Sequence, residues 1–222
     1  LVKSTLNPYN NNFDIKNNIF LAPMAGITDL AFRTVCREHG AGLCYSEMIS
    51  SRAMVFQDRK TRELLKTNND DNPLVIQLFG CEPDIMGEAS KLIEESGFKM
   101  IDINSGCPTP KIVNNGDGCA LMKNPKLLGE IVKNVVNSVK IPVSVKIRTG
   151  YNSDSINAVE CAKVAEANGA SSITVHGRTR EQYYYGKADW DVIRRVKEAV
   201  NIPVMGSGDI FDVTDIKAMH EM

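Results

Sequence analysis

The sequence has no CxxC pair, no Cys/His spacing typical of a zinc site, and no apolar run long enough for a signal peptide or a membrane helix. Its six cysteines are scattered singly. These absences predict free thiols in a reducing cytoplasm, no metal and no membrane partner. Cys36, Cys44 and Cys161 fall in predicted helices or strands as buried small hydrophobes, whereas Cys107 and Cys119 fall in a predicted loop.

Net charge is also small, at -1 with a pI of about 6.4 over 222 residues. Composition alone therefore does not indicate a nucleic-acid binder, but it does not exclude a local basic patch on the surface. Hydrophobic residues make up 43% and charged residues 24% of the chain, which is typical of a globular protein with one large core. A single α/β domain over residues 19–222 fits this composition, preceded by a polar lead-in over residues 1–18.

After the lead-in, short β-branched runs alternate with helical patterns such as 84–97 and 190–200. The predicted strands are 19–23, 43–47, 74–79, 100–104, 143–148, 172–177 and 202–206. This alternation predicts a parallel sheet, either doubly wound or closed as a (β/α)8 TIM barrel. No GxGxxG follows the first strand, so the dinucleotide-binding signature of a doubly wound sheet is missing.

The alternation of side chains along the strands favours the barrel. Polar residues share one face of the central strands and apolar residues share the other. The polar set is Gln77, Asp102, Asn104, Ser144, Lys146, Arg148, Thr174 and His176. In a barrel the apolar face meets the helices, so the polar residues should converge inside, near the carboxyl ends of the strands.

Seven strand–helix units are one short of eight, and the sequence stops at MHEM inside a helical pattern. We therefore expect an incomplete barrel whose eighth unit is missing. Its first and seventh strands would be unpaired edges, so the chain should be less stable than a closed barrel and should hold a cofactor poorly.

The stretch NSGCPTP, residues 104–110, places Cys107 on a stiff turn, because Gly106 supplies unusual dihedrals and Pro108 a fixed one. About 20 residues separate the strand end from the next predicted helix start at Asn124-Pro125, which is long for this architecture. Long loops on this face of a barrel usually build the site. The alternative is that this segment is a surface loop without a functional role.

Three further patterns indicate an anionic ligand. Lys146 inside a barrel needs a carboxylate or an anion as partner, and Asp102 could supply a purely structural ion pair. His176 could be a satisfied structural residue, but HGRTR adds Arg178 and a second arginine, which favours a ligand or a substrate backbone. GSGD, residues 206–209, has two glycines that would let backbone amides approach a phosphate at the usual phosphate site of a barrel. The alternative is that these glycines only allow the chain to turn after the strand.

Six motifs occur in order along the chain: LAPMAGITDLAFR (21–33), VIQLFG (75–80), DINSGCP (102–108), VKIRTGY (145–151), VHGRTR (175–180) and GSGD. Together they resemble the tRNA-dihydrouridine synthases, flavin-dependent barrel enzymes, and the bacterial type most. The resemblance covers nearly everything after residue 18. It implies reduction of uridine in tRNA to 5,6-dihydrouridine, with FMN as hydride carrier and NADPH as reductant.

The resemblance also implies roles for individual residues. FMN would be bound by Pro23, Met24, Ala25, Gln77, Lys146, His176, Ser207, Gly208 and Asp209, and the flipped uridine and its backbone by Asn104, Arg148 and Arg178. Hydride addition at uracil C6 would be completed by a proton from Cys107 to C5. The target base would leave the stack to reach the flavin.

The sequence departs from the family pattern in two places. Ser207 stands where the family usually has Asn, so a phosphate-side contact is expected to change. The Gly-Arg pair of an eighth strand and the helical tRNA-binding domain are absent, which predicts weaker binding of cofactor and RNA.

Two other functions fit parts of the pattern. A flavin barrel acting on a free pyrimidine, like a dihydroorotate dehydrogenase, would share the flavin chemistry, but HGRTR and the SGCP turn favour RNA. A non-catalytic RNA-binding barrel would keep the architecture without turnover. Cys107, Lys146 and His176 argue against it, since binding alone needs no acid beside a flavin.

Overall fold

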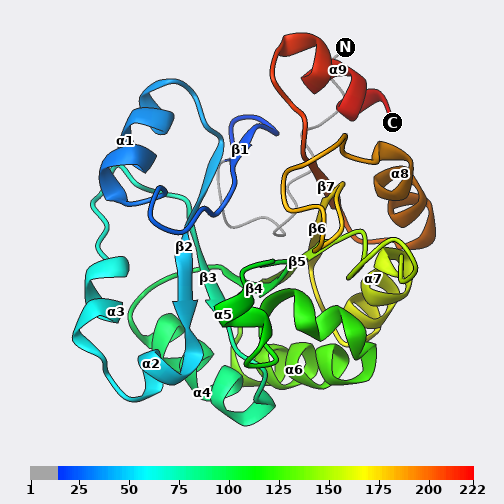
Figure 1. The fold of residues 1–222 in the computed structure, drawn as a ribbon. Helices are drawn as coiled ribbons and strands as arrows, with labels where there is room; N and C mark the ends of the chain where they lie inside the picture. Colours follow the sequence, from blue (N-terminus) through cyan, green and yellow to red (C-terminus); the bar gives the residue numbers. More distant parts are fainter. Residues whose placement is uncertain (1–14) are drawn as a thin grey trace.

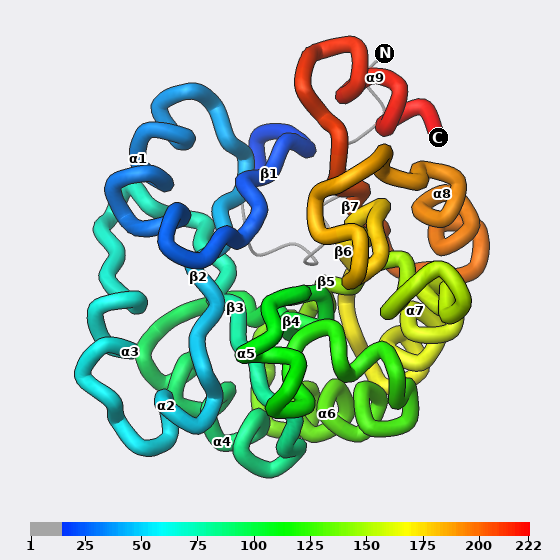
Figure 2. The backbone as a smooth tube through the Cα atoms, viewed as in Figure 1, coloured from blue at the N-terminus to red at the C-terminus, as the bar shows by residue number. Residues whose placement is uncertain are grey.

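A computed structural model describes residues 15–222 of the chain, so most of the lead-in predicted over residues 1–18 lies outside the described residues. Seven parallel strands form one sheet in which neighbours in sequence are neighbours in space (Figure 1). They are β1 (Phe20–Leu21), β2 (Leu43–Ser50), β3 (Leu74–Phe79), β4 (Ile101–Ser105), β5 (Val143–Arg148), β6 (Ser172–His176) and β7 (Val204–Ser207). The sheet curls into a ring that is open between β1 and β7, which confirms the predicted incomplete barrel architecture (Figure 2).

Helices follow the strands and form the outer layer of the ring (Figure 1). They are α1 (Leu30–Glu38), α2 (Ser51–Val55), α3 (Arg59–Leu64), α4 (Pro83–Glu95), α5 (Pro110–Val113), the 3-10 helix η1 (Gly118–Lys123), α6 (Pro125–Ser138), α7 (Ala158–Ala167), α8 (Trp190–Ala199) and α9 (Val213–Glu221). Every strand therefore connects to the next through at least one helix, as parallel pairing requires.

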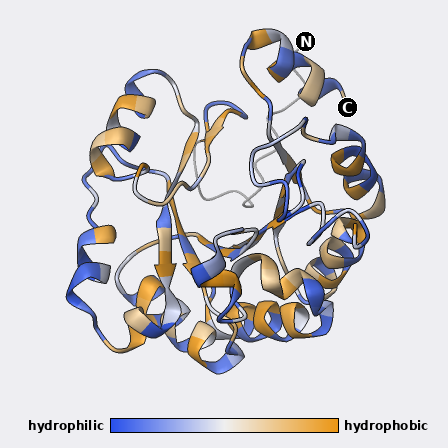
Figure 3. Cartoon of the chain, viewed as in Figure 1, coloured by the Kyte–Doolittle hydropathy of each residue, from blue (hydrophilic) through white to orange (hydrophobic). Residues whose placement is uncertain are grey.

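The apolar strand face meets the helices, as predicted. Ile76, Ile103, Val145 and Val175 are fully buried in one cluster with the inner faces of α4, α6, α7 and α8. Figure 3 shows hydrophobic segments on the strands and on the outer helices, whose faces alternate with hydrophilic ones. Burying each such side chain stabilises the fold by about 1.5–3 kcal/mol, so the packing of the strands against the helices contributes much of the free energy that stabilises the sheet.

Three predicted boundaries are confirmed by their local chemistry. The Asn124 side chain caps α6, accepting from the Leu127 amide, and Pro125 opens that helix. Asp189 caps α8 by accepting from the Val192 amide. Gly97, with φ +93°, follows the last residues of α4, where a side chain would be strained.

The long connection after β4 is more ordered than the sequence suggested. It contains α5 and η1, and Cys119 lies on η1 with no exposed surface. The prediction that Cys119 belongs to a loop is therefore wrong. Burial raises the pKa of its thiol to about 12, so this cysteine is an inert part of the core, like Cys44 and Cys161.

Candidate active site

Strand register brings the predicted polar residues into rows at the carboxyl ends of β3 to β7. One row joins Gln77, Asp102 and Ser144. The next joins Asn104, Lys146 and Thr174, and the outermost joins Arg148, His176 and Ser207. Because parallel strands in register place paired residues on the same face, the sequence-predicted set gathers at one mouth of the ring.

The innermost polar groups satisfy one another, and we call Gln77, Asp102, Asn104 and Ser144 the inner network. The Gln77 amide donates to Asp102 Oδ2 at 2.6 Å, and the Ser144 hydroxyl donates to Asp102 Oδ1 at 2.6 Å. Asn104 Nδ2 donates to Gln77 Oε1 at 2.9 Å and also lies 3.7 Å from Met48 Sδ. This chain of hydrogen bonds crosses three strands.

Lys146 stands next to the inner network but forms no hydrogen bond or ion pair with any of residues 15–222. Burial lowers the pKa of its ammonium to about 8, against the attraction of Asp102. Burial likewise raises the pKa of Asp102 to about 6, although its hydrogen bonds from Gln77 and Ser144 oppose the shift. The alternative of a structural Lys146–Asp102 salt bridge is not realised, since the Asp102 oxygens are occupied by neutral donors.

Asn104 also fixes the turn that carries Cys107. Its Oδ1 accepts from the amides of Gly106 at 3.1 Å and Cys107 at 2.9 Å. The Cys119 amide donates to the Cys107 carbonyl at 3.1 Å, and a Cβ on Gly118 would stand 3.0 Å from Cys107 Cβ. Cys107 is half-buried, and its thiol has no hydrogen-bond partner among residues 15–222, so the turn is rigid while the sulfur stays available.

His176 ends β6 with an unpaired nitrogen. Its Nδ1 is buried and has no partner among the residues described. Burial, reinforced by the positive charges of Lys146, Arg148 and Arg178, lowers the pKa of its imidazole to about 3. The ring is therefore neutral at physiological pH, with one nitrogen able to accept a hydrogen bond and the other able to donate one.

The two predicted substrate arginines mainly bind the protein's own backbone. Arg148 donates through Nε to the Gly106 carbonyl at 2.8 Å and through Nη1 to the carbonyls of Thr179 and Tyr183, both at 2.9 Å. It thereby ties the Cys107 turn to the loop after β6. Nη2 of Arg148 has no partner within residues 15–222.

Arg178 ties the same loop to the end of β7. Its Nε donates to the Tyr185 carbonyl at 3.1 Å, and its Nη2 donates to the Gly186 carbonyl at 2.7 Å and to Asp209 Oδ1 at 2.6 Å. Asp209 also accepts from the Ala188 amide at 2.7 Å, and that bond together with Arg178 lowers the pKa of its carboxyl. Arg178 and Asp209 together clamp the loop after β6 to the end of β7.

The segment after β7 offers backbone donors. The amides of Gly208, Asp209 and Ile210 have no partner among the described residues. Gly208 and Asp209 have φ of +106° and +56°, so the chain turns here, and free successive amides in a turn can form an anion-binding concavity. A Cβ on Gly208 would stand 3.0 Å from Ala188 Cβ and 3.4 Å from His176 Cε1, so glycine keeps this concavity open beside the histidine.

Pro23, Met24 and Ala25 lie in the turn after β1, across the open side of the ring from β7 (Figure 1). The turn is held by the Ile27 and Thr28 amides, which donate to the Met24 carbonyl. None of the described contacts joins this turn to Lys146 or His176.

Sequence reasoning missed the residues that anchor the β1 side. Glu47 on β2 accepts from the Gly26 amide. Arg33 donates to the Thr28 carbonyl at 2.7 Å and forms a fully buried ion pair with Asp71 at 2.7 Å. A charged residue inside the run LCYSE was a signal for Glu47, whereas nothing in the sequence links Arg33 to a carboxylate 38 positions away.

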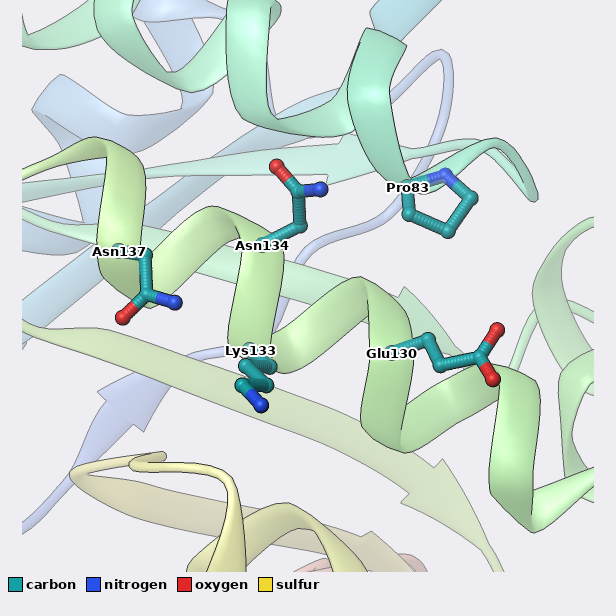
Figure 4. Close-up of a pocket in the computed structure, with 5 residues that line it drawn as sticks. All are labelled: Pro83, Glu130, Lys133, Asn134 and Asn137. Atoms are coloured by element: carbon teal, nitrogen blue, oxygen red, sulfur yellow. The ribbon is translucent and has the colours of Figure 1, made fainter.

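A surface depression lies away from the mouth, between α4 and α6 (Figure 4). Its lining is Pro83, Glu130, Lys133, Asn134 and Asn137. Asn134 there donates to Asp84 Oδ1 at 3.0 Å, which joins the two helices. No residue of the mouth reaches this depression, so it is a feature of helix packing.

Within residues 15–222 no three His, Cys, Asp or Glu side chains are grouped so that they could hold a metal ion. None of the helices described is both long and apolar enough to cross a membrane.

Comparison with protein families gives a match over residues 20–222 to the model described as dihydrouridine synthase (Dus). The chain is 47% identical over 211 residues to a probable tRNA-dihydrouridine synthase of Rickettsia bellii, covering 95% of this chain and 65% of that protein. It is 44% identical over 199 residues to tRNA-dihydrouridine synthase B of Pasteurella multocida, covering 90% of this chain and 60% of that protein. The chain thus spans somewhat less than two thirds of the length of these relatives.

Solved structures share the fold at low identity. Histamine dehydrogenase from Rhizobium sp. 4-9 superposes with a TM-score of 0.67 at 13% identity, covering 93% of this chain and 42% of that one. A variant of NCR from Zymomonas mobilis gives 0.62 at 15% identity, covering 94% and 80%. At such identities the likeness supports the α/β barrel architecture alone.

Proposed function

The chain belongs to the dihydrouridine synthase family, and we propose that it reduces uridine in tRNA to 5,6-dihydrouridine, using FMN as cofactor and NADPH as reductant. The observation that carries the proposal is the mouth itself. An unpaired ammonium of Lys146, an unpaired nitrogen of His176 and the available thiol of Cys107 lie in or just after the carboxyl-terminal parts of three neighbouring strands, β5, β6 and β4.

The residues of the mouth fit a flavin mononucleotide. The free amides of Gly208 to Ile210 suit a phosphate, and Lys146 and His176 offer donors to the polar edge of a ring. The turn of Pro23, Met24 and Ala25 follows β1, the strand on the other side of the open edge from β7. Gln77 uses its amide oxygen and one amide proton within the inner network, so one proton is left for a ligand.

When bound, FMN would supply the hydride that saturates the uracil ring. Lys146 would stabilise negative charge near the reacting rings, because the attraction between an ammonium and a negative charge is stronger in a site that excludes water. Cys107 would give its proton to uracil C5. Its turn is held in place by the Gly106 and Cys107 amides, which donate to Asn104 Oδ1. His176, being neutral, would donate or accept a hydrogen bond without adding charge.

The predicted substrate residues divide into two roles. Arg148 would offer its free Nη2 to the uridine while its other donors hold the two loops. Asn104 and Arg178 make most of their hydrogen bonds with internal partners, so we propose that they act by positioning the Cys107 turn and the loop after β6.

The test is to incubate the full chain with FMN, NADPH and tRNA lacking modifications, and to measure dihydrouridine in the recovered tRNA. Reactions without NADPH and with free uridine in place of tRNA serve as controls. Dihydrouridine formed only in tRNA and only with reductant supports the proposal. Reduction of free pyrimidine in preference to tRNA, or no dihydrouridine from a flavin-loaded chain, would overturn it.

A further inference from the structure

Beside the mouth lies a surface built from cations and aromatic rings, which we call the tyrosine platform: Lys123, Tyr151, Arg180, Tyr183 and Tyr184. Lys123 Nζ stands 4.6 Å from the centre of the Tyr151 ring. The Arg180 guanidinium carbon stands 5.3 Å from the Tyr151 ring and 5.7 Å from the Tyr183 ring. Each cation thus lies within the range at which the face of a ring attracts it.

Arg180 differs from the other arginines of the mouth. Arg148 and Arg178 each make at least three hydrogen bonds, whereas the guanidinium of Arg180 makes none within residues 15–222. Its Nε is moreover buried without a partner. A guanidinium held by stacking and left with unused donors is suited to a phosphate, which accepts from it in a planar, bidentate way.

Tyr184 connects the platform to the mouth. Its ring meets the His176 ring edge to face at 6.4 Å and lies 5.8 Å from the Arg148 guanidinium. Yet 73% of Tyr184 is exposed, and the next residue, Tyr185, is 82% exposed. Adjacent large aromatic side chains left in water beside a site are typical of a binding surface.

The platform is held in shape by its backbone. The Arg180 amide donates to the Gly150 carbonyl at 3.0 Å, and the Glu181 amide donates to the Tyr151 carbonyl at 3.2 Å, so the loops after β5 and β6 run side by side. Arg148 Nη1 donates a hydrogen bond to the Tyr183 carbonyl and so fixes this part of the loop. A surface ordered before binding loses little entropy when a ligand arrives.

We propose that the tyrosine platform binds the single-stranded nucleotides next to the target uridine, with Tyr184 stacking on a base and Arg180 and Lys123 contacting phosphates. The inference rests on the proposed function, since it takes the uridine to occupy the mouth beside Tyr184. Interleaved aromatic rings and unpaired cations are what single-stranded RNA requires, because every base has a flat face and every linkage carries a negative charge. An acidic peptide would use the cations but not the exposed ring.

The test measures binding of the full chain to tRNA lacking modifications, by fluorescence anisotropy at several salt concentrations, and dihydrouridine yield in the same preparations. Arg180→Gln should weaken binding about tenfold and reduce the slope of log Kd against log salt by about 1. Arg195→Gln, on the exposed face of α8, is the matched control and should change neither quantity. Tyr184→Ala should also weaken binding about tenfold, and Tyr184→Phe should restore it, because the ring is kept.

The outcomes separate this inference from the proposed function. If the wild-type chain forms dihydrouridine while Arg180→Gln and Tyr184→Ala bind tRNA like wild type, the platform is wrong and the function stands. If both variants lose binding while the wild-type chain, loaded with flavin, forms no dihydrouridine, the platform stands and the function is wrong. Equal losses in Arg180→Gln and Arg195→Gln would mean diffuse electrostatic attraction, and would also overturn the platform.

Discussion

Two sets of polar groups line the inside of the sheet, and they differ in how far the protein itself satisfies them. In the inner network, Asp102, Asn104 and Gln77 are joined to each other and to Ser144 by hydrogen bonds of 2.6 to 2.9 Å. Lys146, which pairs with Asn104 in the sheet, and His176, one row nearer the carboxyl ends on β6, keep polar atoms with no partner among the residues described. We call Lys146, His176 and the amides of Gly208 to Ile210 the outer mouth.

The difference separates residues that position from residues that bind. A buried polar atom without a partner, such as His176 Nδ1, costs about 1–3 kcal/mol, so a fold that keeps one is less stable than it could be. Such a cost persists where a ligand supplies the missing partner. The inner network is thus read as a support for the Cys107 turn, and the outer mouth as the surface that meets cofactor and base.

Cys107 lies where the two sets meet, and its removal should have the largest effect. In Cys107→Ala, dihydrouridine formation should fall by about 100- to 10,000-fold, the usual contribution of a positioned acid, while flavin content and the rate at which NADPH reduces the flavin without tRNA stay near wild type. Cys107→Ser should be nearly as poor, since a hydroxyl is a much weaker acid than a thiol.

The matched control is Cys81→Ala, which removes the other half-buried thiol near this loop, whose sulfur lies 3.4 Å from the Asn115 carbonyl. It should leave turnover unchanged. A Cys107→Ala chain that modifies tRNA at the wild-type rate would show that this thiol is only packing or contact.

The inner network should give a measurable pH dependence of stability through Asp102. Its pKa is raised from 3.8 to about 6, so the folded chain binds this proton more tightly than the unfolded chain. The resulting stability is fully present below pH 3.8 and is lost as the pH rises through about 6. The difference in unfolding free energy, wild type minus Asp102→Asn, should therefore fall by up to about 3 kcal/mol between pH 4 and 7.

Urea unfolding of both chains at half-unit pH intervals measures this difference. His176 titrates in both chains and cancels from it. A difference that stays flat, or rises with pH, would mean that the Asp102 carboxyl is ionised as easily in the folded chain as in the unfolded one.

Sequence reasoning found the strands and the polar face because both follow from local patterns. The predicted bounds 74–79 and 143–148 are those of β3 and β5, and the alternation along them placed Gln77 and Lys146 on the inner face. A period of two residues needs no knowledge of the rest of the chain. The same local logic identified the stiff turn at Cys107.

Partners distant in the sequence could not be found in this way. That Arg178 binds Asp209, and that Asn104 turns its amide to Gln77 and its oxygen to the Cys107 turn, depends on which strands become neighbours and on side-chain rotamers. The order within the loop after β4, where Cys119 is buried on η1, likewise depends on tertiary packing.

A substitution in the inner network should loosen the support of the Cys107 turn and leave the outer mouth unchanged. Asn104→Ala removes the acceptor for the Gly106 and Cys107 amides and should lower the free energy of unfolding by about 1–3 kcal/mol, with a loss of turnover at near-normal flavin content. Asn152→Ala is the control, because its Oδ1 also accepts a hydrogen bond, from the Ser155 hydroxyl at 2.6 Å, in an exposed turn. Equal effects of both substitutions on stability and turnover would remove the special role of Asn104.

The smallest expected effect concerns Lys146, and it has the opposite sign for stability. In Lys146→Met the unpaired ammonium is replaced by an apolar chain of similar length, so the unfolding free energy without cofactor should stay the same or rise. Affinity for FMN, measured by equilibrium dialysis, should fall about tenfold, because the ligand loses a cation at its polar edge. Lys133→Met, on the exposed side of α6, should change neither property. If Lys146→Met instead destabilised the chain and left FMN affinity unchanged, this lysine would belong with the inner network, and the division between supporting and binding residues would have to be drawn at the outermost row, at His176.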